Sequence, residues 1–433
     1  MKKITVLTAV LLILTILTSL FSFAGGADLP SGDAPISENA QNPNTPSAPS
    51  DENGQLSDTP PNSTGAPEQE PAPSADAFAE FTAQSDAKSL ILIEAETGTV
   101  IYEKNADAPL PPASVTKIMT MLLVMEAIDS GKISDSELVT VSETAASMGG
   151  SQVFLEPGEQ MTVSELLKCV TVASANDACV ALAEHISGSE EAFVSLMNKR
   201  AAELNMTHTS FENTNGLDDT TVNHVISARD IAIMSRELIT KHERILEYSS
   251  IWMDSIRGGA FGLTNTNRLI RFYQGANGLK TGSTAKAGFC ISASAKRSGM
   301  QLICVVMGAS TRDSRNEIAK KLLDFGFANF TFESFTPSEP REITVKGGNK
   351  DTLSLTYEGY KTLTEKANAG KIKEEIMLPG TVKAPIKAGE IIGTARYTIG
   401  DEVLAEIPIK AAEDVSRITF SELMKKLFSA FIY

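Results

Sequence analysis

The residues of this chain that are best suited to chemistry stand in three short strings. In chain order they are Ser114-Val115-Thr116-Lys117, Ser174-Ala175-Asn176 and Lys280-Thr281-Gly282. Taken singly, a Ser-x-x-Lys string is usually an exposed helix start, and a Lys-Thr-Gly string is usually a turn. Together, in this order and spacing, the strings are typical of an acyl-transfer site that uses a serine and a lysine.

Ser114 and Lys117 are predicted to be a nucleophile and its base. A serine hydroxyl is a poor nucleophile until a neighbouring group takes its proton. Three residues apart on a helix, the two side chains share one face and lie within hydrogen-bonding reach. Lys117 acts as a base only when neutral, so we expect burial or a nearby cation, most obviously Lys280, to lower its pKa. The helix start also leaves the Ser114 backbone N–H free to stabilise an oxyanion.

The second string is predicted to lie between two helices, so that its polar side chains project from a turn into a cleft. Ser174 is suited to relay a proton between Lys117 and a leaving group. The amide of Asn176 is suited to hold a peptide carbonyl of the substrate.

The third string lies where the helical pattern gives way to a strand. Lys280 and Thr281 are expected to face a substrate carboxylate. Gly282 would let an edge strand accept a peptide backbone at close range. The backbone N–H of Ser283 is then the second donor to the oxyanion.

The elements around these strings predict an α+β fold. Residues 89–94 and 98–102 are β-rich runs on either side of a turn and predict a hairpin. A helical pattern runs from Ser114 to Gly131, and strand patterns cover 288–293 and 302–307. Further helices are expected at 163–170, 177–186, 190–204, 228–239 and 316–326. Strands at both ends with helices between them predict one sheet, built from distant parts of the chain and covered by a helical cluster.

The catalytic unit is predicted to span residues 79–335, with accessory segments on both sides. Residues 1–24 are typical of an export signal, and an uncleaved anchor is the alternative. Residues 25–78 are rich in proline, serine and acidic residues, which predicts a disordered linker. Residues 338–410 predict a small all-β domain. Apolar residues at helical spacing in 412–433 predict an amphipathic membrane-anchor helix, with packing on its own domain as the alternative.

Composition narrows the function further. The formal net charge of −16 argues against nucleic-acid binding. The export signal places the protein at the extracytoplasmic face of the cell membrane, where disulfides are permitted. We nevertheless expect buried free thiols, because a chain of this size does not need disulfides; the four cysteines are Cys169, Cys179, Cys290 and Cys304. The four histidines lack ligand spacing, so no metal is expected.

The sequence resembles the D-alanyl-D-alanine carboxypeptidases, the low-molecular-mass penicillin-binding proteins of serine peptidase family S11. The resemblance covers about residues 79–330, and it rests on the stretches 112–120, 149–155, 174–178 and 278–282. It implies a β-lactamase/transpeptidase-like catalytic domain, with an antiparallel sheet and a helical cluster, followed by a β-domain and an anchor helix. It also implies removal of the terminal D-Ala from peptidoglycan stem pentapeptides through an acyl-enzyme. No cofactor is implied, and β-lactams would be covalent inhibitors.

The same resemblance assigns roles to individual residues. It implies that Ser114 is the acylated nucleophile and Lys117 its base. Ser174 and Asn176 would be the proton relay and the substrate contact, and Lys280 and Thr281 would bind the substrate carboxylate. Arg315 resembles the family's additional carboxylate-binding arginine, with Arg312 as the alternative. Many relatives have histidine where this chain has Ser283. Only the backbone N–H is needed there, so the difference bears on substrate preference.

Two other functions remain open from sequence alone. A serine β-lactamase shares the three strings, but the best-known class adds a catalytic glutamate. Here residues 211–217 offer Glu212 without the usual Glu-x-x-x-Asn setting. A non-catalytic cell-wall-binding protein with a vestigial site is the other alternative, and the intact strings count against it.

Overall fold

The computed structural model describes residues 75–337 and 341–431. The predicted export signal and most of the predicted linker lie outside the described residues. The first described helix, α2 (Ala75–Gln84), includes the last four residues of that linker, 75–78. Phe78 is buried and stacks on Phe325, with ring centroids 3.8 Å apart. An aromatic contact therefore joins this helix to the folded domain.

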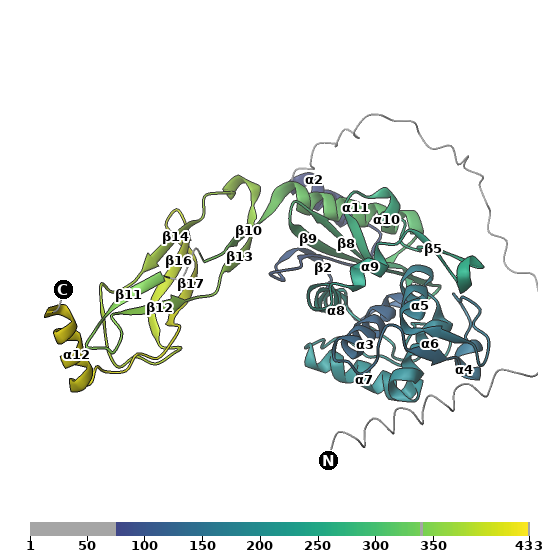
Figure 1. Ribbon diagram of the computed structural model, residues 1–433. Helices are drawn as coiled ribbons and strands as arrows, with labels where there is room; N and C mark the ends of the chain where they lie inside the picture. The colour runs from purple at the N-terminus through teal and green to yellow at the C-terminus, as the bar shows by residue number, and fades with distance from the viewer. Residues whose placement is uncertain (1–74, 338–340, 432–433) are drawn as a thin grey trace, which may run out of the picture. The chain divides into compact units, whose positions relative to one another are not determined.

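A five-stranded antiparallel sheet forms the centre of the first folded part of the chain (Figure 1). The predicted hairpin supplies two of its strands, and residues 276–309 supply the rest, as the sequence pattern predicts. From one edge to the other the strands are β2 (Val100–Lys104), β1 (Ser89–Glu94), β9 (Met300–Ala309), β8 (Gly288–Arg297) and β7 (Ala276–Thr284). Strand β7, which carries the Lys-Thr-Gly string, is an edge strand, as expected.

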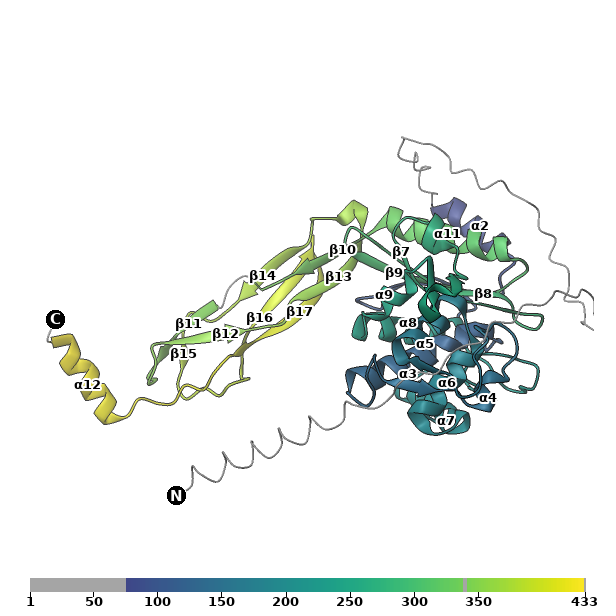
Figure 2. The ribbon, with the colours of Figure 1, turned by 45° about the vertical axis from the view of Figure 1, so that its right-hand side comes forward.

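The sheet is covered on both faces, and β1 illustrates why. Its side chains alternate between two apolar cores: Ile91 and Ile93 belong to one, Leu90 and Leu92 to the other. Figures 1 and 2 show α2 and α11 (Arg312–Asn329) on one face of the sheet and the helical cluster on the other. The cluster contains α3 (Lys117–Asp129), α4 (Glu143–Ala146), α5 (Val163–Lys168), α6 (Asn176–Ser187), α7 (Glu190–Glu203), α8 (Ala228–Lys241) and α9 (Ile245–Ser249).

Short elements connect these parts. Two small antiparallel pairs are β3 (Leu138–Thr140) with β4 (Gln160–Thr162), and β5 (Met253–Ile256) with β6 (Phe261–Thr264). The remaining turns of helix are η1 (Ala113–Thr116), η2 (Cys169–Ala173), η3 (Arg257–Gly259) and α10 (Leu269–Phe272). The predicted last helix is longer than its apolar pattern indicated, since α11 begins at Arg312 with Thr311 as its N-cap.

Beyond α11 the chain is mostly β-structure. Strand β10 (Phe330–Phe335) pairs with β13 (Tyr360–Glu365). A six-stranded sheet follows the order β14 (Lys373–Met377), β16 (Ile391–Ile399), β17 (Glu402–Ala411), β12 (Thr352–Thr356), β11 (Arg341–Lys346) and β15 (Val382–Lys383). A separate apolar core, with Tyr397 completely buried, holds these strands together. The single turn η4 (Lys366–Asn368) follows β13.

The last described element is α12 (Phe420–Phe431). Within 75–337 and 341–431, no helix combines the length and apolar character needed to cross a membrane. All four cysteines are buried and free, which confirms the expectation of unpaired thiols.

Candidate active site

Ser114 and Lys117 lie on a tight turn at the start of α3. The sequence predicted a helix from Ser114, and the structure has the 3-10 turn η1 there, with the α-helix beginning at Lys117. Residues three apart eclipse one another in a 3-10 turn. Lys117 Nζ consequently lies 2.9 Å from Ser114 Oγ. The turn thus brings the two groups into direct contact.

The Lys117 amine is completely buried and makes two further hydrogen bonds. It donates to Asn176 Oδ1 at 2.6 Å and to the backbone carbonyl of Asn215 at 2.8 Å. Burial lowers the pKa of Lys117 to about 8, against the opposing effects of Cys179 and Asp177. Burial, rather than the neighbouring Lys280, is therefore the main reason that this amine can lose its proton near neutral pH.

The second string lies at the junction between η2 and α6. Ser174 is buried and adopts a left-handed conformation (φ 63°), while Asn176 begins the helix. The Asn176 amide accepts from Lys117 and donates through Nδ2 to Gly149 O at 2.7 Å. Both ends of this amide are thus engaged within the protein, whereas the sequence reasoning assigned it to a substrate carbonyl.

The third string lies along β7. Lys280 is buried, and its Nζ donates to Thr281 O at 2.9 Å. Burial, together with the charge of Lys117, lowers the pKa of Lys280 well below its ordinary value. The Thr281 hydroxyl donates to Thr266 Oγ1 at 2.8 Å. The structure therefore brings the third string beside the first.

Gly282 lies where β7 passes the nucleophile turn. A Cβ on Gly282 would be 2.7 Å from Ser114 N and 2.9 Å from Val115 N, closer than side-chain carbons approach backbone. Only glycine permits this separation between the strand and the turn. The next residue, Ser283, is exposed on the same edge strand. The two predicted oxyanion donors, Ser114 and Ser283, thus belong to chain segments in contact.

Arg315 lies on the first turn of α11 and is buried, whereas Arg312 on the same turn is exposed. Its Nη1 lies 3.4 Å from the carbonyl of Cys290, the residue paired with Gly282 across β8 and β7. Burial lowers the pKa of Arg315 to about 10, so it stays charged at neutral pH. Its charge also contributes to the low pKa of Lys280. This placement favours Arg315 over Arg312 as the third cation of the site.

Several residues that support the site were missed by the sequence reasoning. The carbonyls of Asn215 and Gly149 receive hydrogen bonds from Lys117 and Asn176, and main-chain acceptors have no residue-type signal. Asp177, fully buried, accepts from the backbone N–H groups of Val153 and Leu155. This carboxylate fixes the loop that contains Gly149. The sequence signals for this contact were the glycine pair at Gly149 and Gly150 and an aspartate, Asp177, at the start of a predicted helix.

Glu212, the residue that a β-lactamase reading would use, is engaged elsewhere. It is exposed, and its two carboxylate oxygens accept from the backbone N–H groups of Val222 and Asn223 at 2.8 Å each. It is not a hydrogen-bond partner of Ser114 or Lys117. The structure gives no support to Glu212 as an activator of water at this site.

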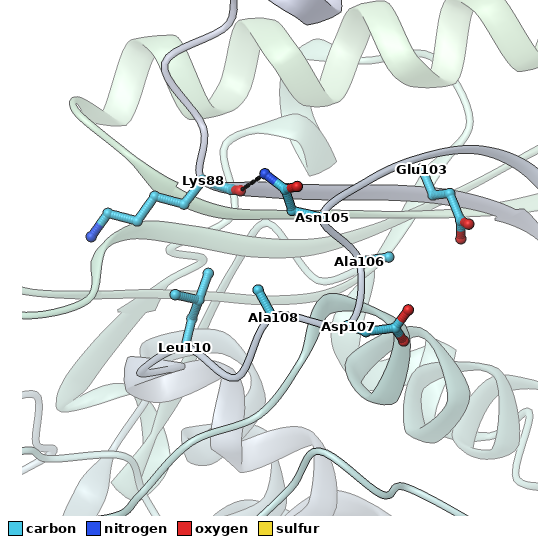
Figure 3. Close-up of a pocket in the computed structure, with 7 residues that line it drawn as sticks. All are labelled: Lys88, Glu103, Asn105, Ala106, Asp107, Ala108 and Leu110. Atoms are coloured by element: carbon cyan, nitrogen blue, oxygen red, sulfur yellow. Dashed lines mark hydrogen bonds between the residues drawn. The ribbon is translucent and has the colours of Figure 1, made fainter.

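A separate pocket of about 460 Å³ opens next to the end of β2 (Figure 3). Its lining contains none of the predicted site residues: Lys88, Glu103, Asn105, Ala106, Asp107, Ala108 and Leu110. Both of its carboxylates are paired with Arg229, at 2.7 Å each. We assign it no chemistry.

An antiparallel sheet with a helical cluster, and a serine–lysine pair beside the edge strand, defines the transpeptidase-like class of proteins. Comparison with known proteins is consistent with this class. Residues 76–311 match the family model described as D-alanyl-D-alanine carboxypeptidase, and residues 334–417 match the model described as penicillin-binding protein 5, C-terminal domain.

Curated relatives match along most of their length. The chain is 48% identical to the D-alanyl-D-alanine carboxypeptidase DacF of Bacillus subtilis over 348 residues, which is 79% of this chain and 89% of the relative. It is 36% identical to DacC of Escherichia coli, over 76% of this chain and 84% of that protein. The chain therefore belongs to the D-alanyl-D-alanine carboxypeptidase family.

Solved structures agree with this assignment. Penicillin-binding protein 5 from Haemophilus influenzae has 33% identity and a TM-score of 0.67, covering 77% of this chain and 98% of that one. Penicillin-binding protein D2 from Listeria monocytogenes, solved in its ampicillin-bound form, has 32% identity and a TM-score of 0.52, over 56% of this chain and 98% of its own. The fold class expected from the sequence is confirmed.

Proposed function

We propose that this protein is a serine-type D-Ala-D-Ala carboxypeptidase that removes the terminal D-Ala from peptidoglycan stem pentapeptides through an acyl-enzyme. The observation that carries the proposal is the buried Lys117 amine, 2.9 Å from Ser114 Oγ with its pKa lowered to about 8. A neutral amine at that distance can take the proton of the hydroxyl at near-neutral pH. Membership of the family supplies the substrate class.

Acylation begins when Ser114 Oγ attacks the carbonyl carbon of the penultimate D-Ala and Lys117 accepts the hydroxyl proton. The developing oxyanion is bound by the backbone N–H groups of Ser114 and Ser283. The contact between Gly282 and the Ser114 turn supports this arrangement, because it keeps the edge strand beside the nucleophile. Such donors each stabilise a transition state by about 3 kcal/mol.

The substrate peptide lies along the free edge of β7, which has a neighbour on one side within its sheet. Its terminal carboxylate is bound by Lys280, Thr281 and Arg315. Arg315 and Lys280 are both buried, and a carboxylate bound beside them favours the charged form of Lys280, because the anion offsets the cost of burying positive charge.

Proton delivery completes the two half-reactions. Ser174, buried at the head of α6 beside Asn176, relays the proton from Lys117 to the amine of the departing D-Ala. Water then attacks the acyl carbon and Lys117 accepts the proton that this water loses. The bond between Ser114 Oγ and the acyl carbon breaks, and Lys117 returns the proton to Ser114 Oγ. A β-lactam enters by the same acylation step and leaves a slowly hydrolysed ester, so β-lactams act as covalent inhibitors.

The proposal is tested with protein lacking residues 1–24 and a peptide ending in D-Ala-D-Ala. We expect release of free D-Ala, and a penicillin adduct that persists for many minutes. Turnover of penicillin within seconds, without D-Ala release, would instead identify a β-lactamase. Failure of both reactions would favour a non-catalytic wall-binding protein.

We further propose that the mature protein works at the extracytoplasmic face of the cell membrane, held there by α12. Export rests on the sequence of residues 1–24. In α12 the large apolar side chains of Phe420, Leu427 and Phe428 are 79%, 46% and 61% exposed. Such exposed apolar area is suited to the interface of a lipid bilayer.

Deletion of the chain from Asp414 onward is expected to release the mature protein from membranes into the soluble fraction, because the exposed apolar side chains of α12 are removed. Sedimentation of membranes followed by labelling with a fluorescent penicillin measures the distribution. Equal total labelling, summed over the two fractions, before and after deletion shows that the truncated protein still reacts with penicillin. Continued sedimentation of the truncated protein would contradict the anchor.

A further inference from the structure

A loop at residues 211–225 lies against the turn that carries Ser114 and Lys117. Besides the Asn215 carbonyl that binds Lys117, the loop places His224 Nε2 2.8 Å from the hydroxyl of Thr116, one of the two residues between Ser114 and Lys117. The Thr116 hydroxyl in turn donates to Ala113 O at 2.8 Å. A chain of hydrogen bonds thus leads from the loop into the nucleophile turn.

The direction of each hydrogen bond in this chain follows from its first member. The backbone N–H of Glu212 can only donate, and it points at His224 Nδ1 at 3.0 Å. Nδ1 must therefore be the acceptor, so the neutral imidazole carries its proton on Nε2. Nε2–H donates to Thr116 Oγ1, which leaves the hydroxyl proton for Ala113 O. The Glu212 N–H, the two ring nitrogens and the Thr116 hydroxyl proton therefore each take part in one hydrogen bond with a fixed direction.

The surroundings keep His224 neutral. The ring is 4% exposed, and Phe211 lies edge-on to it at 5.9 Å. Burial lowers the pKa of His224 to about 4, although the nearby charges of Glu212 and Asp218 oppose the shift and that of Lys286 assists it. Protonation would also place a hydrogen on Nδ1, so that two N–H donors, that of His224 and that of Glu212, would face each other. The tautomer is therefore constant over the pH range in which Lys117 titrates.

The turn that receives these bonds has an unusual backbone. Ala113 has φ 48°, a region that residues with a Cβ rarely adopt. Its carbonyl lies against Gly216 of the same loop, where an added Cβ would be 1.9 Å from the Ala113 oxygen. Gly216 and the His224–Thr116 pair therefore contact the same peptide group. The loop holds Ala113 from two sides.

We propose that His224 is a positioning residue for the serine–lysine pair, acting through Thr116 and Ala113 to fix the turn on which Ser114 and Lys117 stand. The inference rests on the proposed function of those two groups. It assigns His224 no contact with substrate. Its role is to keep Ser114 Oγ within reach of the Lys117 amine.

Two variants of His224 separate its hydrogen bonds. In His224→Gln the amide N–H can reach the position of Nε2 and still donate to Thr116. In His224→Asn the side chain is shorter, so its amide oxygen can accept from the Glu212 N–H but the hydrogen bond to Thr116 is lost. Acylation of Ser114 by a fluorescent penicillin is the readout. We expect His224→Asn to slow acylation by about 10- to 100-fold, the range for small displacements of reacting groups, and His224→Gln to stay within about threefold of wild type.

Thr116→Val tests whether the effect passes through the hydroxyl. It should slow acylation as much as His224→Asn, and the double variant should be no slower than the slower single variant, because both remove the same link. His208→Asn, at an exposed histidine, is the matched control and should leave acylation unchanged. Melting temperatures of all variants are recorded alongside.

A pH profile distinguishes positioning from collapse of the site. If His224 positions the turn, His224→Asn lowers the acylation rate while the midpoint near pH 8 stays in place, because Lys117 remains buried. A midpoint displaced towards 10.5, additive effects in the double variant, or wild-type acylation by His224→Asn would each overturn the proposal. Because acylation is measured directly, these results stand apart from whether the wild type releases D-Ala.

Discussion

Replacement of Ser114 by alanine is expected to abolish D-Ala release and penicillin labelling together. The Ser114 hydroxyl lies 2.9 Å from the Lys117 amine, and no acyl-enzyme forms without it. In serine hydrolases, loss of the nucleophile costs on the order of 10⁶-fold in turnover. The measurement is D-Ala released from a peptide ending in D-Ala-D-Ala, followed over many hours.

The matched control for this variant is Ser195→Ala. Ser195 is an exposed serine on α7 whose hydroxyl donates to the carbonyl of Glu191. The Ser195→Ala protein should release D-Ala at the wild-type rate. Residual activity of Ser114→Ala above about one part in a thousand would mean that another group performs the attack.

Replacement of Lys117 by arginine is expected to slow acylation by about 10²- to 10⁴-fold, the contribution usual for a general base. A guanidinium keeps its proton between pH 6 and 8, so it cannot accept one from Ser114. Acylation by a fluorescent penicillin measures the loss. In the wild type, the rate should rise with pH and level off above about 8, as Lys117 loses its proton.

Lys199→Arg is the control, since Lys199 is exposed on α7 and pairs with Glu203, at 3.8 Å. Lys117→Gln serves as a second variant that introduces no buried guanidinium. Both substitutions at Lys117 should remove the rise in rate between pH 6 and 8. A Lys117→Arg protein that acylates at the wild-type rate, or a wild type whose rate is constant over that interval, would show that another base accepts the proton.

Sequence reasoning located the site because side-chain identity carries the chemistry. A serine, two lysines and an asparagine have recognisable types and spacings, and continuous apolar runs identified β1, β8 and β9. The pairing of Ser114 with Lys117 followed from helical spacing alone. The tighter 3-10 geometry that aligns them did not, because a helical pattern does not distinguish the two helix types.

The supporting parts could not be inferred, since they depend on backbone position. The carbonyl of Asn215 and the close approach of Gly216 to Ala113 involve groups common to every residue. His224 lies 108 positions from Thr116 in the chain, and only the fold brings them together. Similarly, the sequence predicted that burial or a nearby cation lowers the pKa of Lys117, but only the packing around the amine shows that burial is the larger cause.

Mass mapping of a covalent penicillin adduct tests the central claim most directly. After digestion of the labelled wild-type protein, we predict one modified peptide, with the adduct on Ser114. The modified peptide should be absent from Ser114→Ala and strongly diminished in Lys117→Arg labelled for the same time. An adduct on Ser174 or on any other residue, or none at all on folded wild-type protein, would contradict the serine–lysine mechanism.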